Sequence, residues 1–546
     1  MNELDMNISN NNNLNILDLP NEILLIIFNK LNKVDVLYSL FDITQRLNQL
    51  ILDSFYIRNL NMTSMTMKSF YDCIYSIDNQ ILDRICKNVL PRIYHQINEL
   101  IVEQYSIERI LHTISYPQLY SLTLMNFSEE VLFNYLTNNT ILCKLLIEQI
   151  TCLKIDVKDE PTEPPPETLS IIFVLILSLC KRLIKLSFCQ FDNRSTFCTF
   201  DLSSTNFKSS TLTELKIHVV TFDDCLYLLD GYFNCLSTLI IHVKKISYTS
   251  GTIDNKKKLP KLKHFSLTSY PHIFLYDNLI IPLLRRMINL EELILYLSII
   301  RSNKNYIDGS QLYDDILIYM PRLNKFTFNI HTNVDKKNVE IAFSSNEDIQ
   351  RSFSRKEYGP VASHIETFTK ENERRCHNYS LPHEFKSRCH NYSLPYQFKS
   401  FHFLNNSFQG GIFDNVQILT MTDFCPFEYS FFKVISQSFP LLKLLHIVNK
   451  QPQKDKQQSI PLIIFSHLIY LDLRGAHADY AEQFLVDKYC HLPCLLNLNI
   501  DYESLVLVTD NFTNDATRLT CSKLTSLCIK GAFVPPKTFH QYFPLL

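Results

Sequence analysis

The amino-acid sequence predicts an α/β protein, in which a short helical module precedes a long array of strand-and-helix units. Three observations predict this fold class. A short apolar pattern recurs through most of the 546 residues, prolines stand at one fixed position relative to it, and an amphipathic helical pattern lies near the start of the chain. Because repeat proteins grow by stacking units, chain length does not give the number of globular domains.

The recurring pattern is an apolar residue, two other residues, a second apolar residue, one other residue and a third apolar residue. Successive triads begin 24 to 33 residues apart, except for one gap of 93 residues. Alternation at the last two positions is typical of a strand, and this period is typical of stacked repeats. The triads begin at Leu119, Ile150, Leu183, Leu212, Leu236, Leu262, Leu290, Leu323, Val416, Leu442, Leu468, Leu495 and Leu524.

Two further signals mark the passage from helix to strand in these units. Residues 129–136, 311–319 and 478–488, which lie between triads, have helical apolar spacing. Proline ends a helix and favours extended geometry in the residue before it. Prolines stand two residues before five of the triads, at Pro117, Pro260, Pro321, Pro440 and Pro493. Unrelated α/β domains with leucine-rich strands are the alternative, because short apolar runs alone are ambiguous.

The pattern resembles the leucine-rich repeat. The asparagine that normally follows the third apolar position of that repeat is absent here. We therefore expect an irregular leucine-rich-repeat-like solenoid, whose stability is shared between neighbouring units.

The composition argues against several classes of function. Lys and Arg number 53 and Asp and Glu 55, and the net charge of -2 gives no global field that would attract nucleic acid or an anionic membrane. Eight scattered glycines cannot form a phosphate-binding loop, and no zinc-protease, EF-hand or esterase motif is present. We therefore expect no enzyme activity, no catalytic residues and no cofactor.

The compartment is predicted from the start of the chain and from its cysteines. The Asn-rich start has neither the basic nor the apolar region of a signal peptide, and residues 169–180, the most apolar run, are too few to span a bilayer. We expect this run to be a buried helix. Sixteen cysteines without a secretory signal are expected to be reduced, in a cytoplasmic or nuclear protein.

A polar stretch with a tandem duplication separates the two series of triads. Residues 375–387 read RCHNYSLPHEFKS and residues 388–400 read RCHNYSLPYQFKS. A zinc site is the alternative interpretation, but adjacent Cys and His rarely bind one metal, so we predict no metal here. The candidate ligands are Cys376, His377, Cys389 and His390. One further degenerate unit could begin at Phe398, Phe401 and Phe403.

Residues 19–53 read LPNEILLIIFNKLNKVDVLYSLFDITQRLNQLILD. Pro20 suits a first helical turn, and apolar residues from Ile23 to Leu31 follow at helical spacing. Three short helices hold too little volume to bury all of this apolar surface. An exposed apolar helical face is typical of an interaction site, although such helices could instead cap the first repeat.

This segment resembles the F-box, which recruits a Skp-type adaptor of cullin-RING ubiquitin ligases. The resemblance rests on Leu19-Pro20, Glu22-Ile23-Leu24, Ile27-Phe28, Leu31, Asp35-Val36-Leu37, Leu40, Arg46, Leu50-Ile51 and Asp53. It implies a substrate receptor that holds a target protein while the associated RING machinery transfers ubiquitin. The adaptor-binding residues that it implies are Leu19, Pro20, Ile23, Ile27, Leu31 and Val36. The alternative is a leucine-rich-repeat scaffold that binds a protein partner without any ligase.

Candidate target-binding residues lie between the triad positions of two late strands, because alternate strand residues project from the other face. They are Tyr470, Asp472, Arg474, Asn497, Asn499 and Asp501. An ordinary solvated strand face is the alternative interpretation.

These inferences divide the chain into five segments. We predict a disordered Asn-rich tail, an F-box-like module, the first part of the solenoid, a polar insert with the duplication, and the second part of the solenoid. Their respective ranges are 1–16, 17–60, 61–331, 332–412 and 413–546.

Overall fold

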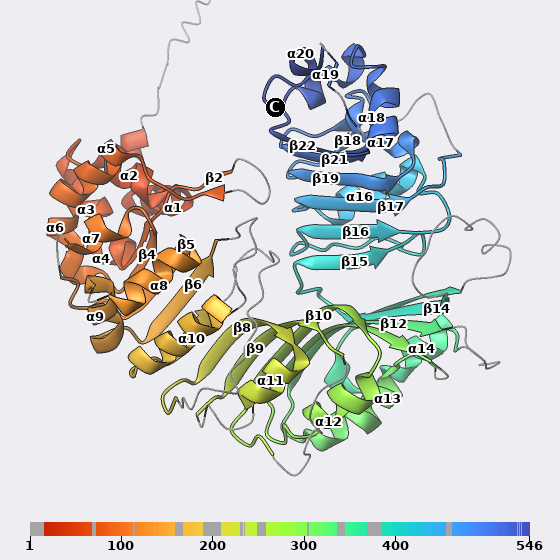
Figure 1. The fold of residues 1–546 in the computed structure, drawn as a ribbon, viewed down its shortest axis with the longest axis horizontal. Coiled ribbons are helices and arrows are strands. Elements are labelled where there is room, and N and C mark those ends of the chain that lie inside the picture. Colours follow the sequence, from red (N-terminus) through yellow and green to blue (C-terminus); the bar gives the residue numbers. More distant parts are fainter. Residues whose placement is uncertain are drawn as a thin grey trace, which may run out of the picture. The chain divides into compact units, whose positions relative to one another are not determined.

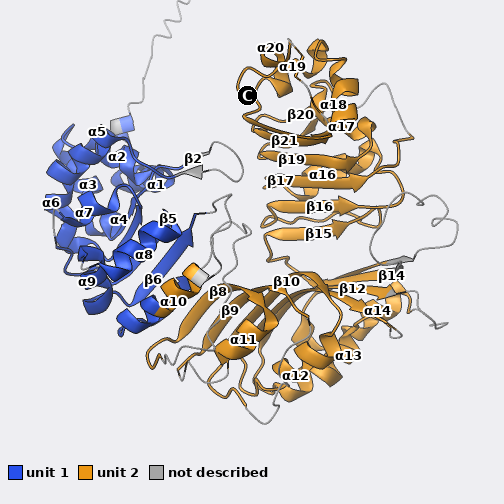
Figure 2. Ribbon diagram, in the orientation of Figure 1, with its two compact units in different colours: residues 1–65, 75–164, 175–191 blue, residues 66–74, 165–174, 192–546 orange. Residues whose placement is uncertain are grey.

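The structure of the protein is a computed structural model. It describes residues 16–67, 73–112, 115–138, 140–158, 167–188, 209–229, 233, 235–247, 258–302, 305–335, 344–367, 385–454, 461–531, 533, 535–536 and 538–546. Apart from Ile16, the predicted N-terminal tail lies outside the described residues. The chain forms two compact units (Figure 2). The first comprises residues 1–65, 75–164 and 175–191, and the second comprises residues 66–74, 165–174 and 192–546.

The first unit begins with short helices and continues into parallel strands (Figure 1). The opening helices are α1 (Asn21–Lys30), α2 (Lys33–Leu40), α3 (Gln45–Ile51) and α4 (Ser54–Ile57). Five strands follow in chain order, each parallel to the next: β1 (Asn59–Met62), β4 (Glu99–Glu103), β5 (Ser121–Phe127), β6 (Cys152–Val157) and β7 (Lys185–Phe188). The connecting helices are α5 (Asn79–Arg84), α6 (Leu90–Ile93), α7 (Ile107–His112), α8 (Glu129–Thr137) and α9 (Ile141–Glu148).

Most described strands of the second unit lie in two large sheets, and two short pairs, β2 (Thr66–Met67) with β3 (Cys73–Ile74) and β18 (Ile463–Ile464) with β20 (Cys490–His491), lie outside them. In the first sheet β8 (Glu214–Thr221), β9 (Thr238–Lys245), β10 (His264–Ile273), β11 (Glu292–Arg301) and β12 (Lys325–Asp335) are parallel, and β14 (Phe385–Ser393) and β13 (Val361–Thr367) follow as antiparallel strands. The second sheet is parallel throughout: β15 (Ser400–Leu404), β16 (Ile418–Thr422), β17 (Leu444–Asn449), β19 (Tyr470–Ala476), β21 (Asn497–Asp501) and β22 (Ser526–Lys530).

Helices connect most strands of the second unit, so the predicted mixed α/β class is confirmed. The helices between strands of the first sheet are α11 (Phe222–Leu229), α12 (Ile281–Leu284), α13 (Gly309–Asp315) and α14 (Asn346–Ser352). The helices that accompany the second sheet are α16 (Tyr429–Ser438), α17 (Ala478–Leu485), α18 (Tyr502–Thr509), α19 (Asp515–Cys521) and α20 (Phe539–Tyr542). The predicted apolar helix is α10 (Glu167–Leu179), in which Ile172, Phe173 and Ile176 are fully buried. Among the helices described, none is both long enough and apolar enough to cross a bilayer.

The apolar triads form the core of both units. Every triad residue is buried except Leu323, Leu527 and Ile529, which are half-buried. Burying a leucine or isoleucine side chain contributes about 1.5 to 3 kcal/mol, so each triad stabilises its strand against both neighbours. Two triads of the same spacing precede those predicted from the sequence and contribute to β1 and β4: Ile57, Leu60 and Met62, and Ile97, Leu100 and Val102.

The segment around the duplication supplies β13, β14 and β15. On β14, Cys389 lies opposite Thr332 of β12 and His390 lies opposite His331, so the adjacent Cys and His project to opposite faces. The residues of the first copy before Phe385, including Cys376 and His377, lie outside the described residues. The structure differs in one respect from the further unit predicted at Phe398, Phe401 and Phe403. Because of a bulge in β15, the third apolar position of this unit is occupied by the buried Leu404 and not by Phe403.

Candidate docking surface

The helix α1 has one buried side and one exposed side. Leu24 and Phe28 are buried, and the Phe28 ring packs edge-on against the Tyr56 ring of α4, with 6.3 Å between the ring centroids. On the other side, Ile23 and Ile26 remain 42% and 58% exposed. An amphipathic helix of a folded unit normally turns its apolar stripe toward the core, so exposed isoleucines on the outer side indicate a contact surface.

The exposed side continues to the end of α1. Residues three and four apart share a helix face, which places Ile27 beside Ile23 and brings Leu31 next to Ile27. Ile27 is half-buried and Leu31 is 53% exposed. We define the docking surface as Ile23, Ile26, Ile27 and Leu31.

Polar contacts fix α1 against the helices that follow it. The Arg46 guanidinium, on α3, donates hydrogen bonds to the Leu19 carbonyl oxygen at 2.6 Å and to the Asn21 side-chain oxygen at 2.8 Å. The Lys33 ammonium donates to the Tyr56 and Asn59 carbonyl oxygens, each at 2.6 Å. The entry to α1 and the start of α2 are therefore both tied to neighbouring elements.

Side-chain caps determine where the short helices begin. The Asn32 side chain accepts a hydrogen bond from the Val34 amide at 2.8 Å at the start of α2, and the Thr44 hydroxyl accepts one from the Leu47 amide at 3.2 Å at the start of α3. Each cap satisfies an amide that has no partner within the helix and contributes about 1 kcal/mol.

The structure places the predicted adaptor-binding residues in different environments. Pro20, Ile23 and Leu31 are exposed, and Leu19 and Ile27 are half-buried. Val36 is 2% exposed, so its side chain belongs to the core between the helices and is not part of the surface. Ile26, which was not predicted, is the most exposed member of the docking surface. Its spacing of three residues from Ile23 is the signal that could have found it.

The predicted target-binding residues do lie together on β19 and β21. Tyr470 and Asp472 are the register partners of Asn497 and Asn499. The Asn499 amide donates to the Tyr470 hydroxyl and, at 3.4 Å, to the Asp472 carboxylate. All four of these side chains are less than 9% exposed. Tyr470, Asp472 and Asn499 form an ordered polar network beside Asn497, which an ordinary solvated strand face would not require.

Arg474 is the exposed member of this network. Its guanidinium donates to both carboxylate oxygens of Asp472, at 3.0 and 2.6 Å, and the Arg474 amide donates to Asp472 at 3.1 Å. Burial alone would raise the pKa of the Asp472 carboxyl, but these hydrogen bonds outweigh it and the pKa is lowered. The pKa of His446, the register partner of Asp472 on β17, is lowered by burial. The Arg474 side chain is therefore held in one orientation and remains 42% exposed.

The fold and these surfaces define a mixed α/β chain with large, mainly parallel sheets. No protein-family model matches the chain, and no curated protein matches it. Among solved structures, a chain of the yeast Rad7 and Elc1 complex is similar over 84% of this chain and 85% of its own length, with 10% sequence identity and a TM-score of 0.24. A TM-score this low establishes neither a shared family nor a shared function.

Proposed function

We propose that the protein is an F-box substrate receptor of a Skp-cullin-F-box ubiquitin ligase. The helices α1 to α3 would be the F-box, and the strand-and-helix units after them would form an irregular leucine-rich-repeat-like solenoid that binds a target protein. The receptor would be cytoplasmic or nuclear and would contribute no catalytic group. Its contribution would be to hold the target near the RING machinery, which raises the effective concentration of the reacting groups.

The observation that carries this proposal is the exposed docking surface on α1. It lies within the segment that resembles the F-box, and its outward isoleucines remain available to a partner although Leu24 and Phe28 complete the internal packing. A helix that only capped the first repeat would turn its apolar side chains inward. A partner with an apolar groove would cover Ile23 and Ile26, and because they are 42% and 58% exposed, burying the rest of both stabilises a complex by about 1.5 to 3 kcal/mol.

Replacing Ile23 and Ile26 with aspartate is expected to abolish co-purification of a Skp-type adaptor with the full-length chain. Both side chains point outward, so the fold should persist, whereas two buried carboxylates without partners would prevent the complex. Arg46→Ala, which removes the hydrogen bonds to Leu19 and Asn21, is expected to weaken adaptor binding, because the start of α1 is then no longer held to α3.

The matched control for this experiment is Leu507→Asp with Leu519→Asp, because both leucines are exposed, at 71% and 55%, and lie on α18 and α19. This variant should retain the adaptor. Equal adaptor recovery with the wild type and the docking-surface variant would show that the docking surface on α1 does not bind the adaptor. If the wild type recovers no adaptor, the protein would instead be a repeat scaffold that acts without a ligase.

Arg474→Glu is expected to release target proteins from the receptor without affecting the adaptor. The change reverses the exposed charge of the polar network and places a second carboxylate beside Asp472, a repulsion that disfavours the orientation seen here. Proteins cross-linked to the wild type and to the variant in cells would be compared by mass spectrometry. The control is Arg351→Glu, at another exposed arginine of the second unit. Identical sets of cross-linked proteins would exclude the network as the target site.

A further inference from the structure

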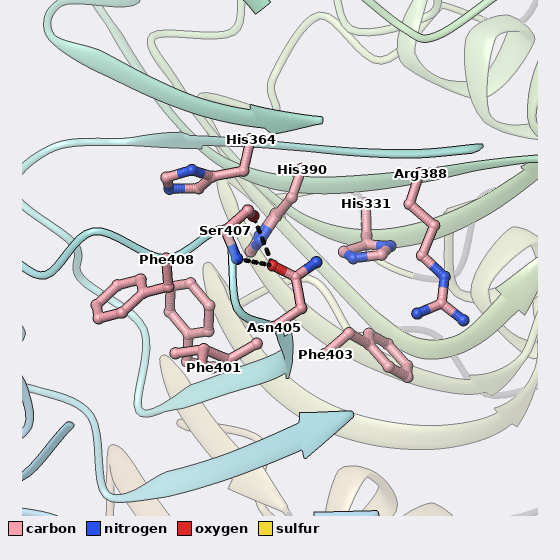
Figure 3. Close-up of a pocket in the computed structure, with 10 residues that line it drawn as sticks. His331, His364, Arg388, His390, Phe401, Phe403, Asn405, Ser407 and Phe408 are labelled. Atoms are coloured by element: carbon pink, nitrogen blue, oxygen red, sulfur yellow. Dashed lines mark hydrogen bonds between the residues drawn. The ribbon is translucent and has the colours of Figure 1, made fainter. Parts of the chain in front are cut away.

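Two cavities of the second unit differ in what they can hold. The first is lined by His364 and His390 of β13 and β14 and by Phe401 and Phe408 (Figure 3). Its volume, taken as the space open to the centres of water-sized atoms, is about 20 Å³, which admits one or two such atoms and no larger ligand. The second cavity has about 130 Å³ by the same measure, which is room for the connected heavy atoms of one amino-acid side chain.

The second cavity lies at the carboxyl ends of two neighbouring parallel strands. Its walls are residues 424–426, which follow β16, and residues 451–454, which follow β17. The crevice outside the carboxyl ends of parallel strands is where α/β proteins commonly bind ligands. The position of this cavity is therefore one at which a ligand site is expected.

Hydrogen bonds between the two walls fix the shape of this cavity. The Asn449 side-chain amide, at the end of β17, donates to the Cys425 carbonyl oxygen at 2.6 Å. The Gln453 side-chain amide donates to the Phe427 carbonyl oxygen at 2.9 Å. Because these bonds tie the segment after β17 to the segment after β16, the walls are already ordered, and a ligand binds without the cost of ordering them.

The lining of the second cavity is mainly uncharged. Phe424, Pro426 and Pro452 contribute rings, and the other uncharged lining residues are a cysteine and two glutamines. Among the described lining residues only Lys454 is charged, and its backbone amide lies 3.2 Å from the Glu428 carboxylate, so a charge of opposite sign is close to the same segment. Aromatic and proline rings without a charge in excess favour an apolar occupant.

Gln451 adds a polar group that matches a peptide backbone. Its backbone amide donates to the Asn449 side chain, and its carbonyl oxygen accepts from the Tyr480 hydroxyl. Within the described part of the chain, the half-buried Gln451 side-chain amide makes no hydrogen bond. A side-chain amide both donates and accepts, as the N–H and C=O groups of an extended chain require. An apolar side chain in the cavity would bring its own backbone to this amide.

The cavity lies close to the polar network that includes Arg474. Val448, on β17, is the register partner of Gly475, which follows Arg474 in the chain. Val448 is 37% exposed and three residues from Gln451, so the Cα atoms of these two residues are at most about 11 Å apart. Four extended residues cover a similar length. One segment can therefore occupy the cavity and also cover Val448 beside the network.

We propose that this cavity holds one large apolar side chain of the target protein, on an extended segment that bonds to Gln451 and continues over Val448 toward Arg474. This inference rests on the proposed function, because it takes the occupant to be the target of the receptor. Leucine and phenylalanine fit the volume and the uncharged lining. A glycine would leave the space empty, and a charged side chain would lose its hydration without gaining an opposite charge.

The test begins with a phage library of random short peptides, selected on the immobilised full-length chain. We expect the selected peptides to share one leucine or phenylalanine. A selected peptide is labelled with a fluorophore, and its binding is measured by anisotropy beside that of the same peptide with glycine at the shared position. The glycine peptide should bind about 10- to 100-fold more weakly, which is the affinity that burying one large apolar side chain contributes.

Three results of these measurements would overturn the proposal. They are a library that yields no binding peptide, equal affinity of the two peptides, and binding of the acetylated amide of the shared amino acid as tight as that of the peptide. The last result would identify a site for a small molecule and not for a protein segment.

Alkylation of cysteine locates the bound peptide in the wild type. Cys425 lines the cavity, Cys494 lies outside it, and both are exposed. Saturating peptide should slow the reaction of Cys425 with iodoacetamide at least about tenfold and leave that of Cys494 unchanged, as mass spectrometry of the digested protein would show. Equal rates at Cys425 with and without peptide would overturn the proposal.

A pair of matched variants tests the cavity itself. Cys425→Trp fills the space and should weaken peptide binding about 10- to 100-fold, whereas Cys494→Trp should bind the peptide as the wild type does. Both variants should still co-purify with the adaptor, because the docking surface is on α1. Unchanged peptide affinity in Cys425→Trp would overturn the cavity as the site and leave the receptor in place. Peptide binding at the cavity without any adaptor would support the site and overturn only the ligase.

Discussion

Arg301→Met is expected to lower the free energy of unfolding of the second unit by about 3 kcal/mol, at the lower end of the range for breaking a buried ion pair. The Arg301 side chain, at the end of β11, is 4% exposed. Its guanidinium donates to Asp277 at 3.0 Å, to the Asn305 carbonyl oxygen at 3.0 Å and to the Gln311 side-chain oxygen at 2.8 Å. Methionine fills a similar volume but leaves these three acceptors without their donor. The Asp277 side chain is 32% exposed, so water partly solvates the remaining charge.

The measurement is urea unfolding followed by far-ultraviolet circular dichroism, because the chain has no tryptophan to serve as a fluorescent probe. Arg351→Met is the matched control: Arg351 also pairs with an aspartate, Asp348, but the two side chains are 76% and 57% exposed. Such a surface pair contributes at most about 0.5 kcal/mol. If both variants lose the same stability, the contacts of Arg301 do not hold β11 to the neighbouring segments. The double variant with Asp277→Asn and Arg301→Met should lose less free energy of unfolding than the sum of the losses in the two single variants.

Most strands could be predicted from the sequence, because the residues that each strand buries are the three apolar residues of a recurring triad. Each triad places three apolar side chains in one core, and this constraint remains visible when the rest of the unit varies in length. The strands β1 and β4 were missed for the same reason. Ile57, Ile97 and Leu119 begin successive triads, but they are 40 and then 22 residues apart, which departs from the period of the later units. The antiparallel strands β13 and β14 were missed because they have no triad.

The candidate site was less predictable, because which side of a short helix is buried depends on its tertiary neighbours. Ile23, Leu24, Ile27 and Phe28 are all strongly apolar in the sequence, and the packing of Phe28 against Tyr56 of α4, which shows that Phe28 faces inward, is a contact between distant segments. The pairing of Asp472 with Arg474 could be inferred from strand alternation, which places both on one face. The contact of His364 and His390 with the residues after β15 could not be inferred, because it depends on the antiparallel strands β13 and β14.

Acidification from about pH 6.5 to about pH 5 is expected to destabilise the second unit steeply, because several of its histidines are buried without charge. His218 and His390 are each 7% exposed, and burial lowers the pKa of both from 6.5 to about 3. The pKa of His331 is also lowered by burial, well below its ordinary value. Neighbouring cationic or titratable groups act in the same direction: His242 and Lys216 for His218, and His364 and His402 for His390.

The sign of the effect follows from proton binding in the two states. Above pH 6.5 these histidines are neutral in both the folded and the unfolded chain, so the stability is fully present. As the pH falls below 6.5, the unfolded chain takes up protons that the folded chain does not bind, and this continues toward the folded pKa values near 3. Each histidine then costs up to about 1.4 kcal/mol per pH unit, and His218, His331 and His390 together cost up to about 4 kcal/mol per pH unit.

His331→Phe should reduce this dependence on pH by up to about 1.4 kcal/mol per pH unit, because one titrating group is lost while the aromatic packing against Phe403 is retained. The measurement is the urea midpoint at a series of pH values, with hydrogen exchange of residues 325–335 reporting on β12 directly. His467→Gln replaces an exposed histidine and is the control that should leave the slope unchanged. An unchanged slope in His331→Phe would show that His331 binds protons equally in the folded and unfolded chains, so that its burial does not disfavour the charged form.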